Sequence, residues 1–96
     1  MTPESEDKRP KFKLGRTVMT RAASVVLTQA EMMGALLRHA RGDWGNIDPA
    51  DAGLNDQALI DGERLLSVYA AADGTRFWVI TEHDRSVTTV LLPEDY

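Results

Sequence analysis

Residues 28–41 alternate between polar and apolar in the pattern of an amphipathic helix. Thr28 and Glu31 form a T-x-x-E capping box, in which each side chain bonds the backbone N–H of the other residue at a helix start. The apolar residues recur with i, i+3, i+4 spacing, as on a helix with one face against the core: Met32, Met33, Leu36, Leu37 and Ala40. Because Gly42 stands where glycine commonly ends a helix, we predict a helix to about Arg41.

A second helix is predicted from Asp48-Pro49 to about Asp61. Aspartate followed by proline is typical of a helix start, and Gly62 is placed to end the helix. Gly53 in its interior weakens it by about 1 kcal/mol relative to alanine.

The last third of the chain has the pattern of an antiparallel meander. Three stretches rich in β-branched and aromatic residues, Arg64–Ala71, Arg76–Glu82 and Val87–Leu92, are each expected to form a strand. Asp73-Gly74 between the first two is a strong hairpin signal. Residues 83–86 form the second expected turn.

The first 27 residues carry weaker signals. Residues 1–11 contain two prolines and no periodicity, and we expect a disordered N-terminal tail. Lys13–Val18 has the residues of a short strand, while residues 19–27 are ambiguous. The predicted fold is α+β: residues 12–96 form a single domain of order β-α-α-β-β-β, with two helices packed on one face of a small antiparallel sheet.

Charge is divided unevenly along the 96 residues. Residues 1–41 hold eight Lys/Arg against four Asp/Glu, while residues 42–96 hold three arginines against eleven acids. A basic helix beside an ordinary acidic surface is one interpretation. The other is an acidic face that meets a basic protein partner. Direct binding of nucleic acid by the acidic half is disfavoured because phosphate is repelled.

Several classes of function lack their sequence signals. Without cysteine, thiol redox chemistry and thiolate metal sites are excluded, and no nucleotide-binding, metalloprotease or nucleophile-elbow motif is present. We expect no cofactor and no metal. The polar N-terminus has no secretory signal, and no apolar run approaches the ~18 residues of a membrane span, so the expected location is cytoplasmic and not in a membrane.

His39 and Asn55 are polar residues in positions that call for an explanation. His39 borders the apolar face of the first helix, where a hydrogen-bonded structural histidine is commoner than a catalytic one, although its ordinary pKa suits acid–base work. Asn55 falls within the expected buried arc of the second helix, formed by Leu54, Ala58 and Leu59. A buried amide must be hydrogen-bonded. Asn55 either ties down the Gly42–Asn46 turn or points into a pocket.

Two further features have double interpretations. The stretch Thr81–Thr89 is either a polar hairpin on a solvent-facing sheet or a small site in which Arg85 binds a carboxylate or phosphate. Trp78 is expected in the core, and Trp44 either covers the core or anchors a partner. The residues that we consider for binding are Asp43, Trp44, Asn55, Arg64, Glu82, Asp84 and Arg85.

Five segments together resemble a family of small bacterial proteins described as plasmid-related. They are H-A-R-G-D-W-G at 39–45, N-D-Q-A-L at 55–59, R-L-L-S-V-Y at 64–69, W-V-I-T-E-H-D-R-S at 78–86 and T-T-V-L-L-P-E-D-Y at 88–96. The resemblance covers roughly residues 38–96. It implies a plasmid or other mobile element as context, where anti-defence, toxin–antitoxin and maintenance roles are common, and it supplies no mechanism.

Three functions remain open on these observations. The first is a non-enzymatic protein-binding module, anti-defence among its possible roles, that uses the acidic C-terminal half. The second is a metal-independent ribonuclease of the toxin type, with His39 or Glu82 as base, Arg85 on the phosphate and Ser67 or Thr88 assisting. The third is a homo-oligomeric accessory protein, in which an uncovered strand edge favours a homodimer.

Overall fold

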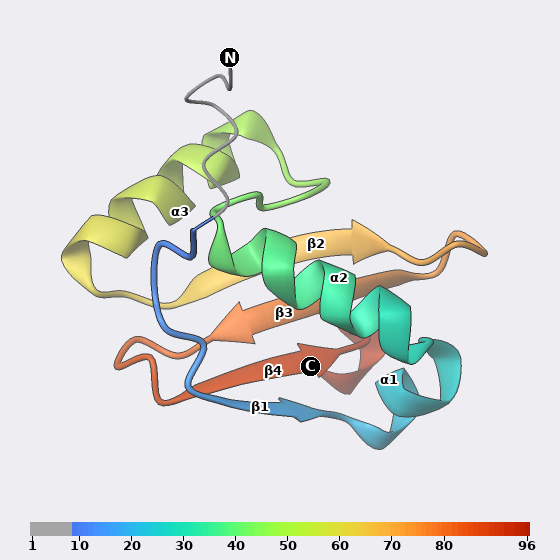
Figure 1. Cartoon of the computed structure of the whole chain (residues 1–96). Helices are drawn as coiled ribbons and strands as arrows, with labels where there is room; N and C mark the ends of the chain where they lie inside the picture. Colours follow the sequence, from blue (N-terminus) through green and yellow to red (C-terminus); the bar gives the residue numbers. More distant parts are fainter. Residues whose placement is uncertain (1–8) are drawn as a thin grey trace, which may run out of the picture.

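The computed structural model describes residues 9–96 of the chain. Its elements follow the order β1 (Arg16–Met19), α1 (Arg21–Val26), α2 (Gln29–Ala40), α3 (Pro49–Asp61), β2 (Leu65–Ala70), β3 (Arg76–Thr81), β4 (Val87–Leu91) and a final 3₁₀ turn, η2 (Pro93–Asp95) (Figure 1). The predicted α+β class is confirmed, and so is the C-terminal meander.

The sheet has four strands in the order β1-β4-β3-β2. β2 pairs with β3 and β3 with β4, both antiparallel, whereas β1 runs parallel to β4 with Arg16 opposite Val87. The sheet is therefore mixed rather than wholly antiparallel. The first strand lies near the predicted place, and it joins the sheet beside the last strand, an arrangement that requires the chain to cross the sheet through α1, α2 and α3.

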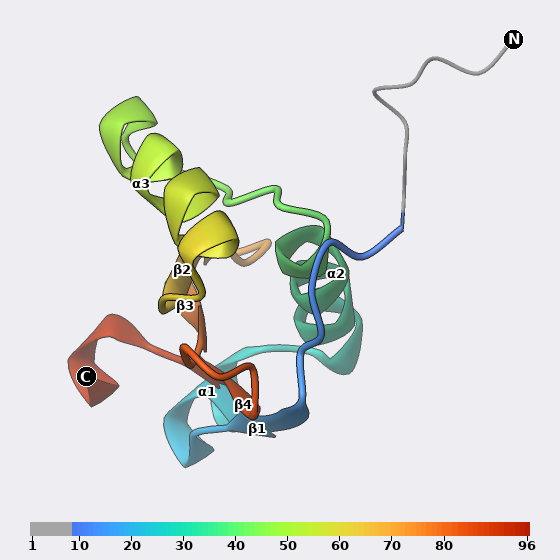
Figure 2. The same cartoon turned by 90° about the vertical axis from the view of Figure 1, so that its left-hand side faces the viewer.

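α2 and α3 occupy two different positions against this sheet. α2 lies across one face, while the C-terminal turn lies on the other side (Figure 2). α3 lies along the β2 edge, so the expectation of two helices on one face holds for α2 and needs correction for α3. This placement leaves the face opposite α2 without a helical layer.

α2 begins with the predicted capping box, in which Thr28 and Glu31 bond each other's backbone N–H. Its buried side is rotated from the expected one: Ala35 and His39 are buried beside Leu36 and Ala40. Met33 and Leu37 are about half exposed instead. The rotated helix places His39 against the sheet, where its ring nitrogens lie within hydrogen-bond distance of the buried Ser67 and Thr81 hydroxyls.

α1 was not predicted from the sequence. Thr20 caps it by accepting from the Ala23 backbone N–H at 3.2 Å, and Ala23 is fully buried in the main core with Leu27. The other residues of this six-residue helix include exposed Val25 and Val26, so it lacks the apolar stripe that reveals a helix in a sequence.

The main core lies between α2 and the sheet. Side chains alternate across the strands, and the buried set includes Tyr69, Phe77, Val79 and Val90. A smaller cluster joins Trp44, Ala58 and Leu65 beneath α3.

The predicted N-terminal tail lies mostly outside the described residues. Its last residue, Lys11, donates its backbone N–H to the Ala40 carbonyl at 2.7 Å. Within residues 9–96, no helix has the length and apolar character needed to cross a membrane, and no three His, Asp or Glu side chains are grouped to hold a metal ion.

Candidate functional site

His39 lies at the centre of a fully buried chain of polar side chains. Its Nδ1 is 2.6 Å from the Ser67 Oγ and its Nε2 is 2.8 Å from the Thr81 Oγ1. Thr81 in turn lies 2.7 Å from the Thr88 Oγ1, which donates to the Leu14 carbonyl at 2.7 Å. All four side chains have no exposed surface.

The last bond of this chain fixes the direction of the others. Since Thr88 uses its one hydroxyl proton on Leu14, Thr81 must donate to Thr88, and Thr81 must then accept from His39 Nε2–H. A neutral imidazole carries one proton, so Nδ1 accepts from the Ser67 hydroxyl. The neutral ring thus has a partner at both nitrogens.

Burial, together with the nearby Arg85 charge, lowers the pKa of His39 to about 4. The ring is also enclosed by aromatic neighbours, with Phe12 at 5.3 Å and Trp44 at 5.7 Å between ring centroids. A Ser–His pair of this geometry could activate a nucleophile, but neither side chain can reach a substrate. The structural interpretation of His39 therefore fits, and the interpretation of Thr81–Thr89 as a solvent-facing hairpin fails at Thr81 and Thr88.

Arg85 is bound to main-chain carbonyls rather than directed to solvent. Its Nη1 donates to the Glu63 and Glu82 oxygens at 2.6 and 3.0 Å, and its Nη2 donates to the Ala58 oxygen at 3.3 Å. These bonds fasten the C-terminal end of α3 to the β3–β4 turn. The Glu82 carboxylate, part of the ribonuclease alternative, pairs with Arg64 at 3.6 Å. His39 and Thr88 are fully buried, so these two side chains do not face solvent together with Glu82 and Arg85.

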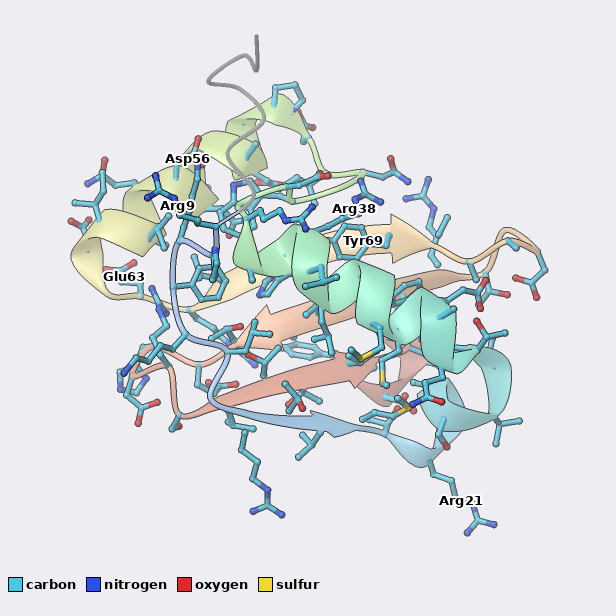
Figure 3. The ribbon with its side chains drawn as sticks, in the orientation of Figure 1. Arg9, Arg21, Arg38, Asp56, Glu63 and Tyr69 are labelled. Atoms are coloured by element: carbon cyan, nitrogen blue, oxygen red, sulfur yellow. The ribbon has the colours of Figure 1, made fainter. Side chains whose placement is uncertain are left out.

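Asp43 and Trp44 hold the loop between α2 and α3. Asp43 receives two bonds from Arg38, at 2.8 and 3.2 Å, and this ion pair lowers the pKa of the Asp43 carboxyl. Arg38 also stacks on the Tyr69 ring, 4.6 Å from its centroid (Figure 3). Tyr69 donates to the Asp43 carbonyl at 2.5 Å, and burial raises the pKa of the tyrosine to about 12. Trp44 is buried and donates to the Asp56 carboxylate at 2.9 Å, so it covers the core.

The remaining sequence candidates also make bonds within the chain. Asn55 bonds the main chain of Leu66 on β2, not the Gly42–Asn46 turn that was one expectation. Asp84 accepts from the backbone and hydroxyl of Ser86, and Arg64 donates to the Tyr96 hydroxyl at 2.8 Å. The polar candidates are thus not brought together in one site.

A groove opens on the sheet face opposite α2. Leu66, Val68 and Trp78 form its floor, and the main hollow measures about 600 Å³. A smaller hollow of about 250 Å³ shares Leu66 and Trp78 with it and extends to Ile80 and Tyr96. We call these two hollows together the open-face groove. A separate hollow of about 370 Å³ lies between residues 10–15 and α2.

The open-face groove has an acidic wall. Asp51, Leu54 and Asn55 line it from α3 with the i, i+3, i+4 spacing of one helix face, and Asp48 stands at the start of that helix. Leu54 was expected in the buried arc of this helix, and that expectation is wrong: its side chain is 68% exposed and lines the groove. Arg76 lines the groove from β3, and Pro93 borders it from the C-terminal turn.

Sequence reasoning missed this groove, although a signal for it existed. β2 reads LLSVYA and β3 reads RFWVIT, so apolar residues occupy both alternating sets of positions. Strands of this kind are typical of sheets that are covered on both faces, whereas here one face has no helix over it. Trp78, expected in the core, lies half-buried on the open face.

Comparison with protein-family models, with curated proteins and with solved structures found no match to the chain. The resemblance to plasmid-related bacterial proteins therefore stays a prediction.

Proposed function

We propose that this chain is a non-enzymatic protein-binding module whose partner covers the open-face groove. The observation that supports it is a groove that is open to solvent and floored by the partly buried apolar side chains of Leu66, Val68 and Trp78, on a sheet whose other face carries the main core. An antiparallel sheet with one face in water usually carries polar side chains there, and exposed apolar patches commonly mark interaction sites. A tryptophan in such a floor is also a typical interface anchor.

The groove belongs to the acidic half of the chain, since its lining residues lie between Asn46 and Tyr96. The two carboxylates of the α3 wall, Asp48 and Asp51, support a basic or amphipathic protein partner over nucleic acid, because that wall would repel phosphate. Service to a plasmid or other mobile element, including an anti-defence role, is the biological context that the sequence resemblance adds to the proposal.

Site-specific photo-crosslinking in the organism that encodes the chain would test the proposal. A photoreactive amino acid is placed at Val68 or at Leu54, on the floor and the wall of the groove. Thr17, exposed on β1, and Gln57, exposed on α3, are the control positions. We expect the same cross-linked protein from both groove positions and from neither control. Absence of an adduct at Val68 and Leu54, or equal adducts at all four positions, would contradict the proposal.

The ribonuclease alternative has its own measurement. Expression of wild type and of His39→Ala is induced, and growth and total RNA are compared. We expect intact RNA with both proteins, because the His39 ring is enclosed. RNA fragmentation by wild type that His39→Ala abolishes would establish a nuclease and exclude the binding module as the primary function.

A further inference from the structure

Building on the proposed function, we infer that the occupant of the open-face groove is an amphipathic α-helix of the partner, with lysine or arginine beside the α3 wall. The inference rests on three observations: the closed edge of β2, the shape and polarity of the groove floor, and the unpaired charges on its rim.

The β2 edge beside the groove is closed to an added strand. The Leu66 N–H and carbonyl are both bonded to the Asn55 side chain, at 3.2 and 2.6 Å. At Val68, the N–H donates to the Trp44 carbonyl at 3.0 Å and the carbonyl accepts from Asn46 at 2.7 Å. Strand addition requires these main-chain groups, so a partner must bind here through side chains.

The floor suits the apolar face of a helix. Leu66 and Val68 stand on β2, and Trp78 stands opposite Val68 on β3, so the three side chains form one continuous apolar surface. Leu54 extends that surface up the α3 wall. A helix that rests in such a groove presents apolar anchors at i, i+3, i+4 and i+7, and its own main chain needs no outside partner.

The carboxylates on the groove wall determine which charge is favoured on the adjacent flank of that helix. Within residues 9–96, Asp48 and Asp51 form no ion pair and no side-chain hydrogen bond. Other surface acids of the chain, such as Asp43 and Glu82, are paired with arginines. Two unpaired carboxylates along one wall favour a cation on the adjacent flank of the bound helix.

Two designed helical peptides with the same apolar stripe test this inference. One carries lysine on both flanks and the other carries glutamate, and binding is measured by calorimetry with amide chemical-shift mapping. We expect the lysine peptide to shift the amides of β2, β3 and α3, and to bind roughly tenfold or more tighter than the glutamate peptide, equal to about 1.4 kcal/mol or more. The double variant Asp48→Lys/Asp51→Lys should reverse this order.

Matched variants distinguish binding in the open-face groove from non-specific hydrophobic binding. Leu54→Asp should weaken binding of the lysine peptide roughly tenfold. Ile60→Asp should leave binding unchanged, because Ile60 is 78% exposed on the same helix and is not among the groove-lining residues. Equal effects of the two variants, or amide shifts confined to the hollow between residues 10–15 and α2, would overturn the inference.

The outcomes distinguish the inference from the proposed function. Cross-linking at Val68 and Leu54 without binding of the lysine peptide would refute the helix and leave the binding module standing. Failure of both experiments would refute both. A dimer of the chain alone that Val68→Asp dissociates would identify a second copy as the occupant and overturn the inference.

Discussion

The Asn55 side chain pairs with the main chain of Leu66 as a neighbouring strand would. Its Nδ2 donates to the Leu66 carbonyl at 2.6 Å, and its Oδ1 accepts from the Leu66 N–H at 3.2 Å. One amide therefore satisfies both outward-facing groups of a strand residue, and it joins α3 to the sheet at the same point. Because Asn55 is buried, water cannot readily replace it.

Replacing Asn55 by alanine should lower the free energy of unfolding by about 2 kcal/mol, since a partly buried N–H and carbonyl lose their partners. Urea denaturation measures this. The control is Gln57→Ala, which removes an exposed bond to Asp61 on the same helix and should change stability by less than about 0.5 kcal/mol. Equal losses in the two variants would show that Asn55 contributes no more than a surface amide.

Stability should depend on pH through His39. Its pKa is about 4 in the folded protein and 6.5 as the ordinary value, so the unfolded chain binds the extra proton first as pH falls. The stabilisation is complete above pH 6.5 and is lost progressively as pH falls towards 4. The loss amounts to about 3 kcal/mol over the whole window, at 1.36 kcal/mol for each pKa unit.

Urea denaturation of wild type and His39→Gln between pH 7 and pH 5 measures this dependence. This range lies above the ordinary carboxyl pKa values, so the acids contribute little to it. The variant should be less stable at pH 7 and should have a flatter pH dependence. Parallel curves for the two proteins would show that His39 is not the responsible group.

Replacing Arg85 by glycine should destabilise the protein less than replacing it by alanine. Its backbone has a φ of 60°, in the left-handed region that glycine adopts without strain. Arg85→Ala and Arg85→Gly both lose the bonds to the carbonyls of Glu63, Glu82 and Ala58, but only alanine keeps the backbone strain. The glycine variant should therefore be the more stable by about 1 kcal/mol. Thermal unfolding of both variants tests this, and a more stable alanine variant would argue against the left-handed backbone.

Two glycine-to-alanine changes should have opposite signs. At Gly45, with φ of 77°, an added Cβ would lie 2.0 Å from the Val68 carbonyl oxygen, so Gly45→Ala should separate the α2–α3 loop from β2 and cost about 3 kcal/mol or more. At Gly53, inside α3, an added Cβ has nothing within 4 Å. Gly53→Ala should stabilise the protein by about 1 kcal/mol. Calorimetric melting of both variants measures the difference, and a destabilised Gly53→Ala would mean that α3 needs this glycine.

Local signals were enough to predict part of this fold. The Thr28–Glu31 box located α2, and Asp73-Gly74 located the hairpin, because caps and tight turns depend on residues close in sequence. α1 has a cap at Thr20 but no amphipathic stripe. The parallel pairing of Arg16 with Val87 has no local signature at all, since it depends on the path of the whole chain between them.

The candidate site was harder to predict for a different reason. Asn55 was identified as a buried amide because it interrupts an apolar arc, but its partner Leu66 lies on another element. In β3, Phe77 and Trp78 are both aromatic and face opposite sides of the sheet. With apolar residues on both sides, alternation cannot indicate which side the single covering helix α2 takes. The open-face groove therefore became visible only with the arrangement of the layers.

The position of β1 beside β4 also orders events during synthesis. Arg16–Met19 is translated well before Val87–Leu91, its neighbour in the sheet. At a translation rate of about 5–20 residues per second, on the order of 4 to 14 seconds pass between the synthesis of β1 and that of β4. Val18 and Met19 stay uncovered for that time, while the β2–β3 hairpin can already form. A chain that stops before Val87 lacks not only β4 but also the means of docking β1.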